Sequence, residues 1–268
     1  MNYLDQLESE SVYILREAFS RIDKLAMLWS LGKDSNTMVW LAKKAFFGHV
    51  PFPVLHVDTG RKFPEMYAFR ERYAKEWNLN LIVRPCPPVE EVDQTLPPAA
   101  RSAARKTLGL RNVLQEFGFQ GVIAGIRRDE ESIRAKERVF SPRGEDGAWN
   151  LKDQPPEFWN QFKTEFAPGT HLRIHPLLDW TELNIWEYIR RENIPTVSLY
   201  YNHGDGKRYR SLGCYPCTHA VDSVSRNVDD IILELQSGKF ANIAERSGRA
   251  QDKADGGGLE TLRRDGYM

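Results

Sequence analysis

A short polar loop between an apolar run and a helical pattern is the stretch whose residue types best suit phosphate binding. The apolar run spans residues 25–28, and beyond the loop apolar residues recur at helical spacing over residues 38–46. Backbone N–H groups at a helix N-terminus attract anions, and a lysine in the loop adds a cation. The glycine and lysine do not have Walker spacing. We therefore expect phosphate or pyrophosphate binding, rather than an ordinary strand-to-helix turn, at Ser30, Leu31, Gly32, Lys33, Asp34 and Ser35.

A charged stretch over residues 125–138 is the second candidate for chemistry. Mixed charge of this kind usually forms a solvated helix face with ion pairs between residues four apart. Here the stretch directly follows a short apolar run, so Arg127 and Arg128 can reach the crevice that the loop borders. Guanidinium groups suit tetrahedral oxyanions. We expect Lys33, Arg127 and Arg128 to be the catalytic cations and Gly125 to contact the nucleotide.

Asp58 lies near the end of another apolar run, residues 52–60, and is followed by Thr59. In a parallel sheet, such strand ends face the ligand crevice. We therefore expect Asp58 to contact the nucleotide or a Mg²⁺ ion. An alternative role, which does not exclude the first, is the N-cap of a helix that begins near Pro64.

The three cysteines are an odd number in a long chain, so we expect reduced thiols rather than a disulfide framework. Cys86 stands between prolines with no partner nearby in the sequence. Cys214 and Cys217 form a Cys-x-x-Cys pair with three alternative uses: a structural pair, a redox or persulfide-carrying dithiol, and half of a metal site. The metal site would need His203, His219 or another chain to complete it.

The elements that position these residues alternate between strands and helices. Strands are expected at residues 25–28, 52–60, 79–83 and 121–125, and helices at 4–22, 38–46, 64–77, 103–117 and 180–191, the last with Thr181 as its N-cap. This alternation predicts an α/β fold with a doubly wound, mostly parallel sheet and flanking helices. Residues 84–100, with five prolines, are expected to form a surface excursion, and residues 140–170 an irregular lobe. We expect a catalytic domain over residues 1–239 and an irregular, polar tail over residues 240–268.

The composition limits the kinds of partner. Lysine plus arginine and aspartate plus glutamate both number 37, so there is no overall basic field and a nucleic-acid partner is not favoured. No apolar run approaches the ~18 residues that span a bilayer, and the N-terminus lacks the pattern of a signal peptide. We therefore expect a cytoplasmic protein with a local anion site and no membrane partner.

The loop resembles the pyrophosphate loop of N-type ATP pyrophosphatases, Ser-Gly-Gly-Lys-Asp-Ser, with Leu31 in place of the first glycine. This variant loop, the Gly-x-Arg-Arg-Asp-Glu-Glu string from Gly125 and the Leu-His-Val-Asp-Thr-Gly string at residues 55–60 resemble the small subunit of bacterial heterodimeric ATP sulfurylase. The likeness continues through residues 174–189 and 192–195. The chain is thereby identified as a member of the phosphoadenylyl-sulfate reductase family of N-type ATP pyrophosphatases, which implies an adenine nucleotide alpha hydrolase-like fold.

The resemblance implies a nucleotidyltransferase of sulfate assimilation that converts ATP and sulfate to adenylyl sulfate and pyrophosphate. ATP and Mg²⁺ are the cofactors it implies, and a regulatory GTPase subunit is the partner that drives this uphill reaction. It also implies that the tail lies against the site, with Arg246 and Arg249 as anion contacts. Another small acceptor in place of sulfate, and a homo-oligomer, also agree with the sequence.

Two features depart from the sulfurylase pattern. A long insertion expected after Leu199 is missing, and the Cys-x-Pro-Cys-Thr segment at residues 214–218 resembles iron–sulfur adenylyl-sulfate reductases. Those enzymes need four thiolates for their cluster and a further cysteine near the C-terminus. This chain has only three cysteines, and none follows Cys217. An ATP-dependent sulfurtransferase, or a sulfonucleotide-reductase-like enzyme, using Cys214 and Cys217 is therefore the alternative. A nucleotide-sensing protein without catalysis is a third, since Leu31 alters the loop.

Overall fold

The computed structural model describes residues 2–131, 134–144, 149–150, 152, 154–241 and 243–248 of the chain. It is built around a six-stranded sheet with the order β3-β2-β1-β4-β6-β5, parallel except for β5 at one edge. The strands are β1 Leu25–Leu28, β2 Val54–Asp58, β3 Leu81–Pro85, β4 Gly121–Ile123, β5 Phe140–Arg143 and β6 His171–Ile174. This confirms the predicted doubly wound, mostly parallel sheet.

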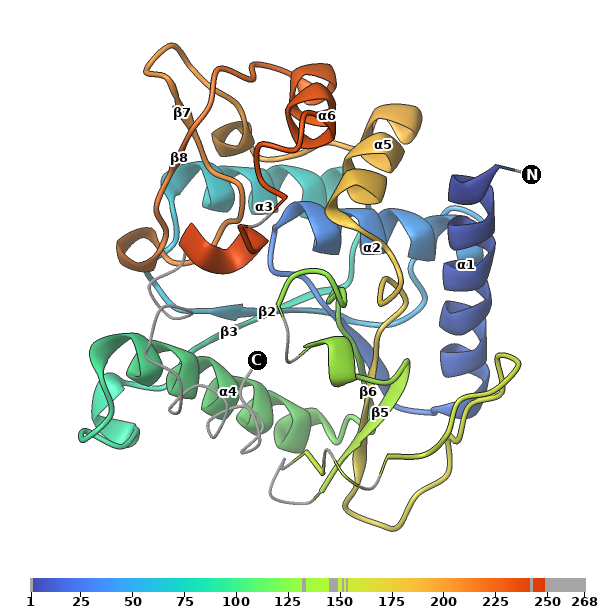
Figure 1. Ribbon diagram of the computed structural model, residues 1–268. Coiled ribbons are helices and arrows are strands. Elements are labelled where there is room, and N and C mark those ends of the chain that lie inside the picture. Colours follow the sequence, from blue (N-terminus) through green and yellow to red (C-terminus); the bar gives the residue numbers. More distant parts are fainter. Residues whose placement is uncertain are drawn as a thin grey trace.

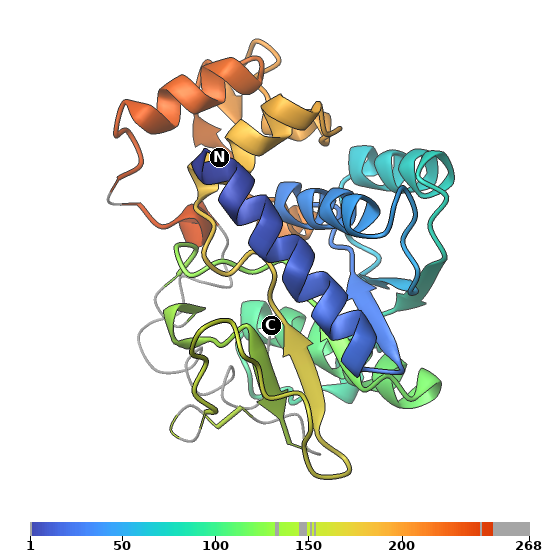
Figure 2. The same ribbon diagram turned by 90° about the vertical axis from the view of Figure 1, so that its right-hand side faces the viewer.

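Within the described ranges, six α-helices accompany the sheet: α1 Tyr3–Arg21, α2 Lys33–Ala45, α3 Pro64–Glu76, α4 Pro98–Phe117, α5 Glu182–Glu192 and α6 Val228–Gln236. A small hairpin, β7 Lys207–Arg208 with β8 Val221–Asp222, lies outside the main sheet. The 3-10 turns are η1 Val89–Glu91, η2 Arg134–Lys136, η3 Ser198–Tyr200, η4 Tyr215–Cys217 and η5 Glu245–Gly248. Figure 1 shows α2 and α3 on one side of the sheet and α4 on the other, and Figure 2 shows α1 crossing in front of the strands.

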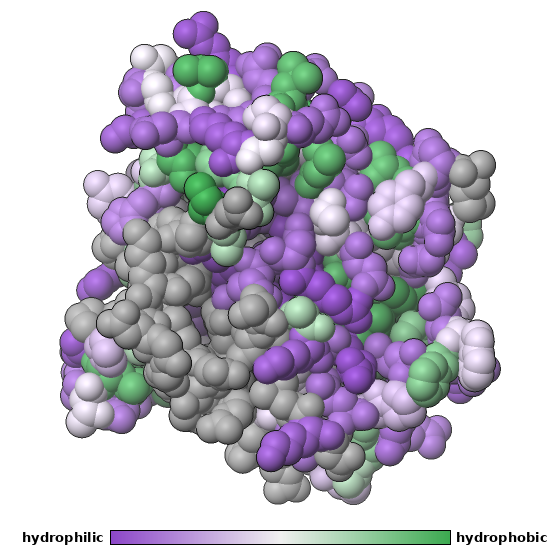
Figure 3. Space-filling model, in the orientation of Figure 1, coloured by the Kyte–Doolittle hydropathy of each residue, from purple (hydrophilic) through white to green (hydrophobic). Residues whose placement is uncertain are grey.

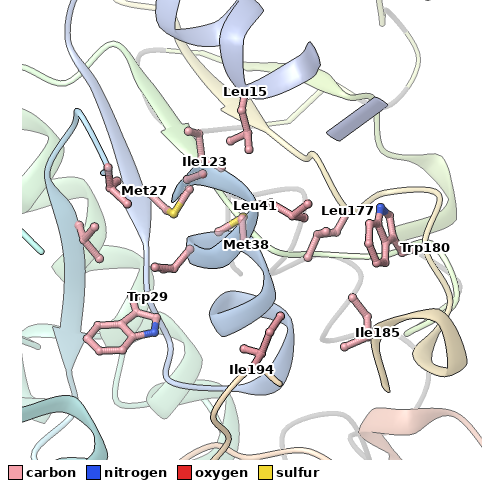
Figure 4. Close-up of a cluster of buried hydrophobic side chains, with 14 of the residues drawn as sticks. Leu15, Met27, Trp29, Met38, Leu41, Ile123, Leu177, Trp180, Ile185 and Ile194 are labelled. Atoms are coloured by element: carbon pink, nitrogen blue, oxygen red, sulfur yellow. The ribbon is translucent and has the colours of Figure 1, made fainter. Parts of the chain in front are cut away.

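Alternation along the strands explains the two layers. Met27, Ile123 and Ile174 belong to a large core with α1 and α2, which Figure 4 shows in close-up around Met38 and Leu41. The intervening strand residues, such as Ala26 and Val122, pack with α4 in two smaller clusters. Since successive side chains of a strand point to opposite faces, both faces of β1 and β4 are apolar and buried.

Local signals place several elements as predicted. Thr181 caps α5 as expected, because its Oγ1 accepts a hydrogen bond from Asn184 N at 3.2 Å. The helix expected from residue 103 begins earlier, at Pro98, where proline is tolerated in the first helical turn. The surface excursion expected over residues 84–100 is shorter than predicted, because its first two residues end β3 and its last three begin α4, with the 3-10 turn η1 between them.

The expectation of an irregular lobe over residues 140–170 was wrong at its start. Residues 140–143 form β5, which pairs antiparallel with β6 at the edge of the sheet. Pro142 concealed this strand from sequence reasoning, yet proline is compatible with an edge strand. The correction matters because β5 carries Arg143 to the cleft described below.

Within the described residues, no helix is long and apolar enough to cross a membrane. In the space-filling view, hydrophobic residues are scattered among hydrophilic ones on the visible face (Figure 3). The tail predicted over residues 240–268 lies mostly outside the described residues, which end at residue 248.

Ser11 offers a test of how α1 is fixed to the core. Its buried hydroxyl donates to the Pro176 carbonyl at 2.8 Å and accepts from Trp180 Nε1 at 3.0 Å. Ser11→Ala leaves two buried polar groups without this partner, so we expect the free energy of unfolding to fall by about 1–3 kcal/mol in urea titrations. Ser9→Ala, at an exposed position of the same helix, is the control, and equal midpoints for the two variants would contradict the assignment.

Candidate functional site

A cleft of about 220 Å³ lies on the α4 side of the sheet, at the carboxyl ends of the parallel strands. Its apolar end is formed by Leu28, Leu55 and Val57 from β1 and β2. The phosphate loop, the segment after β4 and side chains from β5 and β6 continue the wall. This is the position at which doubly wound sheets bind nucleotides.

The loop connects β1 to α2 as predicted, and its backbone explains the unusual Leu31. Leu31 has φ +70°, the left-handed region that glycine adopts without cost and other residues at about 1 kcal/mol. Its side chain is fully buried in the main core, which offsets that cost. Leu31 thus contributes backbone to the loop, while its side chain points into the core instead of the cleft.

Hydrogen bonds hold the loop in shape. Lys33 N donates to the Tyr200 hydroxyl at 2.9 Å, and Ser35 Oγ donates to the Gly32 carbonyl at 3.0 Å. Ser30 Oγ donates to Ser35 Oγ at 3.1 Å. A Cβ at Gly32 would lie 3.3 Å from the Tyr200 oxygen, so a side chain there would press on this bond. Tyr200 was not predicted, because it belongs to η3, far away in the sequence.

Gly125 lets the end of β4 touch the loop. A Cβ built there would lie 3.4 Å from the Asp34 carbonyl carbon and 3.5 Å from Ser35 N. The absence of a side chain therefore brings the segment that carries Arg127 directly against the N-terminus of α2.

Glu245 from η5 joins the two predicted cations into one buried ion cluster. One carboxylate oxygen of Glu245 contacts Lys33 Nζ and the other contacts Arg127 Nη2. Asp34 also pairs with both cations, at 3.1 Å from Lys33 Nζ. Arg127 is completed by Asp129 Oδ1, 2.8 Å from its Nε. In Figure 1, η5 is the last coloured turn, beside the start of α2.

The charges explain the protonation of this cluster. Burial favours the protonated form of Glu245, but Lys33 and Arg127 outweigh it and hold the pKa of that carboxyl far below its usual value. Glu130 is a buried neighbour that pairs with Arg134. Burial would raise the pKa of Glu130, but the charges of Arg134 and Arg127 lower it below its usual value. Glu245 was missed because its segment reads as flexible, and Glu130 because its string reads as a charged helix face.

The remaining predicted residues lie in different places. Asp58 accepts from Gly60 N and Tyr67 Oη, both at 2.9 Å, and pairs with Arg70 at 3.1 Å, but it is not among the described residues that line the cleft. Arg128 pairs with Asp179 and is not among the described lining residues either. Lys33 and Arg127 are also absent from that lining, because both are buried in the ion cluster behind the loop.

The two predicted anion contacts of the tail have different outcomes. Arg246 lines the cleft and lies 3.8 Å from Glu131, whereas Arg249 lies outside the described residues.

Cys214 lies beside the cleft, because it directly follows the lining residue Gly213. Cys214 is buried, and its Sγ donates to Thr59 Oγ1 at 3.3 Å. Burial would raise the pKa of Cys214, but Lys106 and the Thr59 hydrogen bond contribute to a net lowering. Burial raises the pKa of Cys86 to about 11. Among the described residues, the only cluster of three side chains suited to a metal ion is Asp34, Glu130 and Glu245, so neither His203 nor His219 completes a metal site with the cysteines.

The charge of the cleft wall is positive. Among the described lining residues, six cations face three carboxylates: Lys62, Lys106, Arg134, Arg143, Arg173 and Arg246 against Asp34, Glu130 and Glu137. His175 adds no charge near neutrality, because burial lowers its pKa to about 4. Arg143 and Arg173 were not predicted as site residues, since sequence reasoning placed no strand at either position. The wall suits a ligand that carries several negative charges.

Comparisons with known proteins show the family of the chain. Residues 24–220 match the model of the phosphoadenosine phosphosulfate reductase domain family. The chain is 40% identical to sulfate adenylyltransferase subunit 2 of Zymomonas mobilis subsp. mobilis, an alignment that covers all of this chain and 98% of that protein. It is 41% identical to the protein of the same description from Ectopseudomonas mendocina, over all of this chain and 99% of the relative.

Solved structures resemble the fold at low sequence identity. A Candida glabrata FMN adenylyltransferase in complex with FMN and the ATP analogue AMPCPP superposes with a TM-score of 0.55 at 17% identity, over 92% of this chain and 90% of that one. A phosphoadenylyl-sulfate reductase from Candida auris gives a TM-score of 0.51 at 17% identity, over 82% and 98% of the two chains. Both confirm the predicted fold type.

Glu245→Gln tests the ion cluster. Removing one partner of a buried pair typically costs about 3 kcal/mol, so we expect the free energy of unfolding to fall by that order. The folded-state pKa of Glu245 is depressed, so its contribution is complete above about pH 4.5, the unfolded value, and is lost as the pH falls through the folded pKa. The difference between wild type and variant should therefore be constant from pH 8 to pH 5 and shrink only in more acidic solution.

The matched control is Glu116→Gln, which removes a carboxylate that pairs with Arg84 on the surface. We expect it to change the unfolding midpoint much less than Glu245→Gln does, because solvent screens exposed pairs. Equal effects of the two substitutions would refute the importance of the buried cluster.

Proposed function

The chain belongs to the sulfate adenylyltransferase subunit 2 family, as its motifs predicted, and from this we propose that it transfers the adenylyl group of ATP to sulfate and releases pyrophosphate. The observation that carries the proposal is the convergence of the Lys33 and Arg127 side chains on a single anionic group at the start of α2. That group is the carboxylate of Glu245. A pyrophosphate group, with more negative charge, fits the same set of donors.

The nucleotide is proposed to follow the length of the cleft. Its base would lie at the apolar end against Leu28, Leu55 and Val57, and its β- and γ-phosphates on the loop. Lys33 N already donates to Tyr200, but the next N–H groups, of Asp34 and Ser35, have no acceptor within the helix, which makes them suited to phosphate oxygens. Gly32, Ser35 and Gly125 would shape this contact by keeping the backbone accessible.

Binding of ATP then exchanges one anion for another. Lys33 and Arg127 are both fully buried, so leaving them without Glu245 and without phosphate would be costly. We infer that pyrophosphate displaces the Glu245 carboxylate from Lys33 as it enters. In the exchange, neither cation has to be exposed alone to a low-dielectric interior.

The chemical step needs no covalent intermediate. A sulfate oxygen attacks the α-phosphorus in line with the departing pyrophosphate, and the P–O bond to that leaving group breaks. Lys33, Arg127 and the α2 N-terminus stabilise the charge that develops on the pyrophosphate. The buried walls of the cleft hold the reactants and keep water from competing as the nucleophile.

Mg²⁺ is part of this proposal. The carboxylates of Asp34, Glu130 and Glu245 offer oxygen atoms within 4.8 Å of one another, the hard ligands that Mg²⁺ prefers. When bound, the ion would neutralise charge on the phosphates of ATP. Asp58, the residue expected from the sequence to hold Mg²⁺, belongs to no such carboxylate cluster among the described residues and is not among those that line the cleft, so we propose the other three carboxylates as the site.

The partner is proposed to be the other subunit that the description of the relatives implies, and specifically a regulatory GTPase. Forming adenylyl sulfate is uphill, so the reaction needs a coupled source of free energy. Purified chain with this partner, ATP, GTP and sulfate should release pyrophosphate only when sulfate is present. If no sulfate-dependent release occurs, the proposed function is wrong.

Lys33→Met tests the role of the loop cation. Loss of a charge that stabilises the leaving group should lower kcat/KM for ATP by about 100-fold or more. Lys44→Met is the control, since Lys44 is a partly exposed residue of the same helix that pairs with Glu8 and Glu192. Steady-state pyrophosphate release measures both, and a similar activity in the two variants would argue against the assignment.

The position of Cys214 beside the cleft, with its pKa lowered from the ordinary thiol value, favours one second candidate, a sulfurtransferase. The double variant Cys214→Ser, Cys217→Ser distinguishes the sulfurylase from the sulfurtransferase. The sulfurylase reaction uses neither thiol, so we expect this variant to keep the sulfate-dependent pyrophosphate release of the wild type. Loss of that activity, together with sulfur gained on either cysteine in mass spectra after persulfide loading of the wild type, would favour the sulfurtransferase.

A further inference from the structure

Two arginines stand together at the β5–β6 side of the cleft, across the sheet from Leu28, Leu55 and Val57. Ser141 on β5 lies opposite Arg173 on β6, and Arg143 lies opposite His171. Directly opposed residues share a face, so Arg143 and Arg173 are diagonal neighbours on the face that the cleft borders. Both line the cleft.

Arg143 is fixed by its contacts, and one of its hydrogen-bond donors is not used by them. Its Nη1 donates to Ser141 Oγ at 2.6 Å, its Nη2 pairs with Glu137 Oε1 at 2.7 Å, and its guanidinium lies 4.9 Å from the Trp149 ring centre. Its Nε is buried and has no hydrogen-bond partner within the part of the chain that is described. Such a fixed, almost fully buried guanidinium is pre-organised to bind an anion.

The charges around Arg143 and Arg173 also favour an anion at this position. Burial, with Arg143 as the next contribution, lowers the pKa of Arg173 to about 9, although Glu137 opposes the shift. An arginine in a protein rarely relieves such a position by losing its proton. An anion bound beside the two guanidinium groups would reduce the repulsion between Arg143 and Arg173.

We propose that Arg143 and Arg173 form the subsite for the acceptor oxyanion, so that sulfate binds between them. This rests on the proposed function, and it assigns the acceptor to residues that the motifs did not indicate. A tetrahedral dianion has oxygen atoms that can accept from Arg143 Nε and at the same time face the Arg173 guanidinium. The acceptor subsite thereby replaces Arg128, whose partner is Asp179, as the expected sulfate contact.

The order of the strands supports sulfate, rather than the γ-phosphate of ATP, as the ligand of Arg143 and Arg173. Neighbouring strands are ~4.8 Å apart, so β5 lies roughly 19 Å from β2 across the sheet. The base at β2 and β1 and the pyrophosphate at the start of α2 occupy the other part of the cleft. In-line displacement requires the nucleophile on the side of the α-phosphorus away from the leaving group, and the wall formed by β4, β6 and β5 is left for it.

The test compares Michaelis constants in the complete complex with the GTPase subunit. Arg143→Gln and Arg173→Gln should raise the KM for sulfate on the order of 10- to 100-fold while leaving the KM for ATP nearly unchanged, as expected for lost hydrogen bonds to a charged ligand. Arg143→Lys keeps the charge and should be intermediate. Arg208→Gln is the control, because Arg208 is equally buried but pairs with Glu234 away from the cleft.

A rise in the KM for ATP instead of sulfate would assign the arginines to the nucleotide and overturn the proposal. If neither the KM for sulfate nor the KM for ATP changes in the arginine variants, the proposal is also overturned. The proposed function would still hold in that case, provided that the wild-type complex is active. If the wild-type complex shows no sulfate-dependent activity, the proposed function fails and binding still decides the subsite. Sodium sulfate, against sodium chloride at equal ionic strength, should then raise the melting temperature of the wild type and of Arg208→Gln more than that of Arg143→Lys.

Discussion

Neutralising two buried cations, Lys33 and Arg127, is the constraint on which the rest of the site depends. Each is taken wholly out of water, and neither position would be tolerable without carboxylates at contact distance. Asp34 supplies one carboxylate from within the loop and Glu245 supplies the other from η5. The cluster is therefore stable as it stands, yet it is built from donors that an anionic ligand can take over.

The fold brings these groups together from separate parts of the chain. The end of β1 and the start of α2 carry the loop, and Gly125 lets the segment after β4 approach it within van der Waals contact. Tyr200 fixes the loop backbone from η3. On the far side, the antiparallel edge strand β5 adds Arg143. A parallel sheet thus fixes the nucleotide end, and the added edge strand extends the cleft towards a second anion.

Local patterns were sufficient for the loop and its neighbours but not for its partners. The strand-loop-helix order around Lys33 and the Thr181 cap follow from periodicity and turn chemistry, and both were predicted. Glu245 follows from no local pattern, because its role is set by a contact 212 positions away in the chain. Arg143 was hidden by Pro142 in a strand of four residues. Arg128, next to Arg127 in the same charged string, points to Asp179 instead, a choice that depends on backbone direction after β4.

The position of Glu245 also bears on the order in which the protein assembles. The loop and α2 are local structures that form quickly, whereas a contact over 212 positions must await the closure of nearly the whole chain. Until η5 docks, Lys33 and Arg127 lack their second carboxylate. The last described turn of the chain thus completes the charge balance of a loop that forms near its beginning. An anion that binds only the folded chain at this site would stabilise it further by mass action.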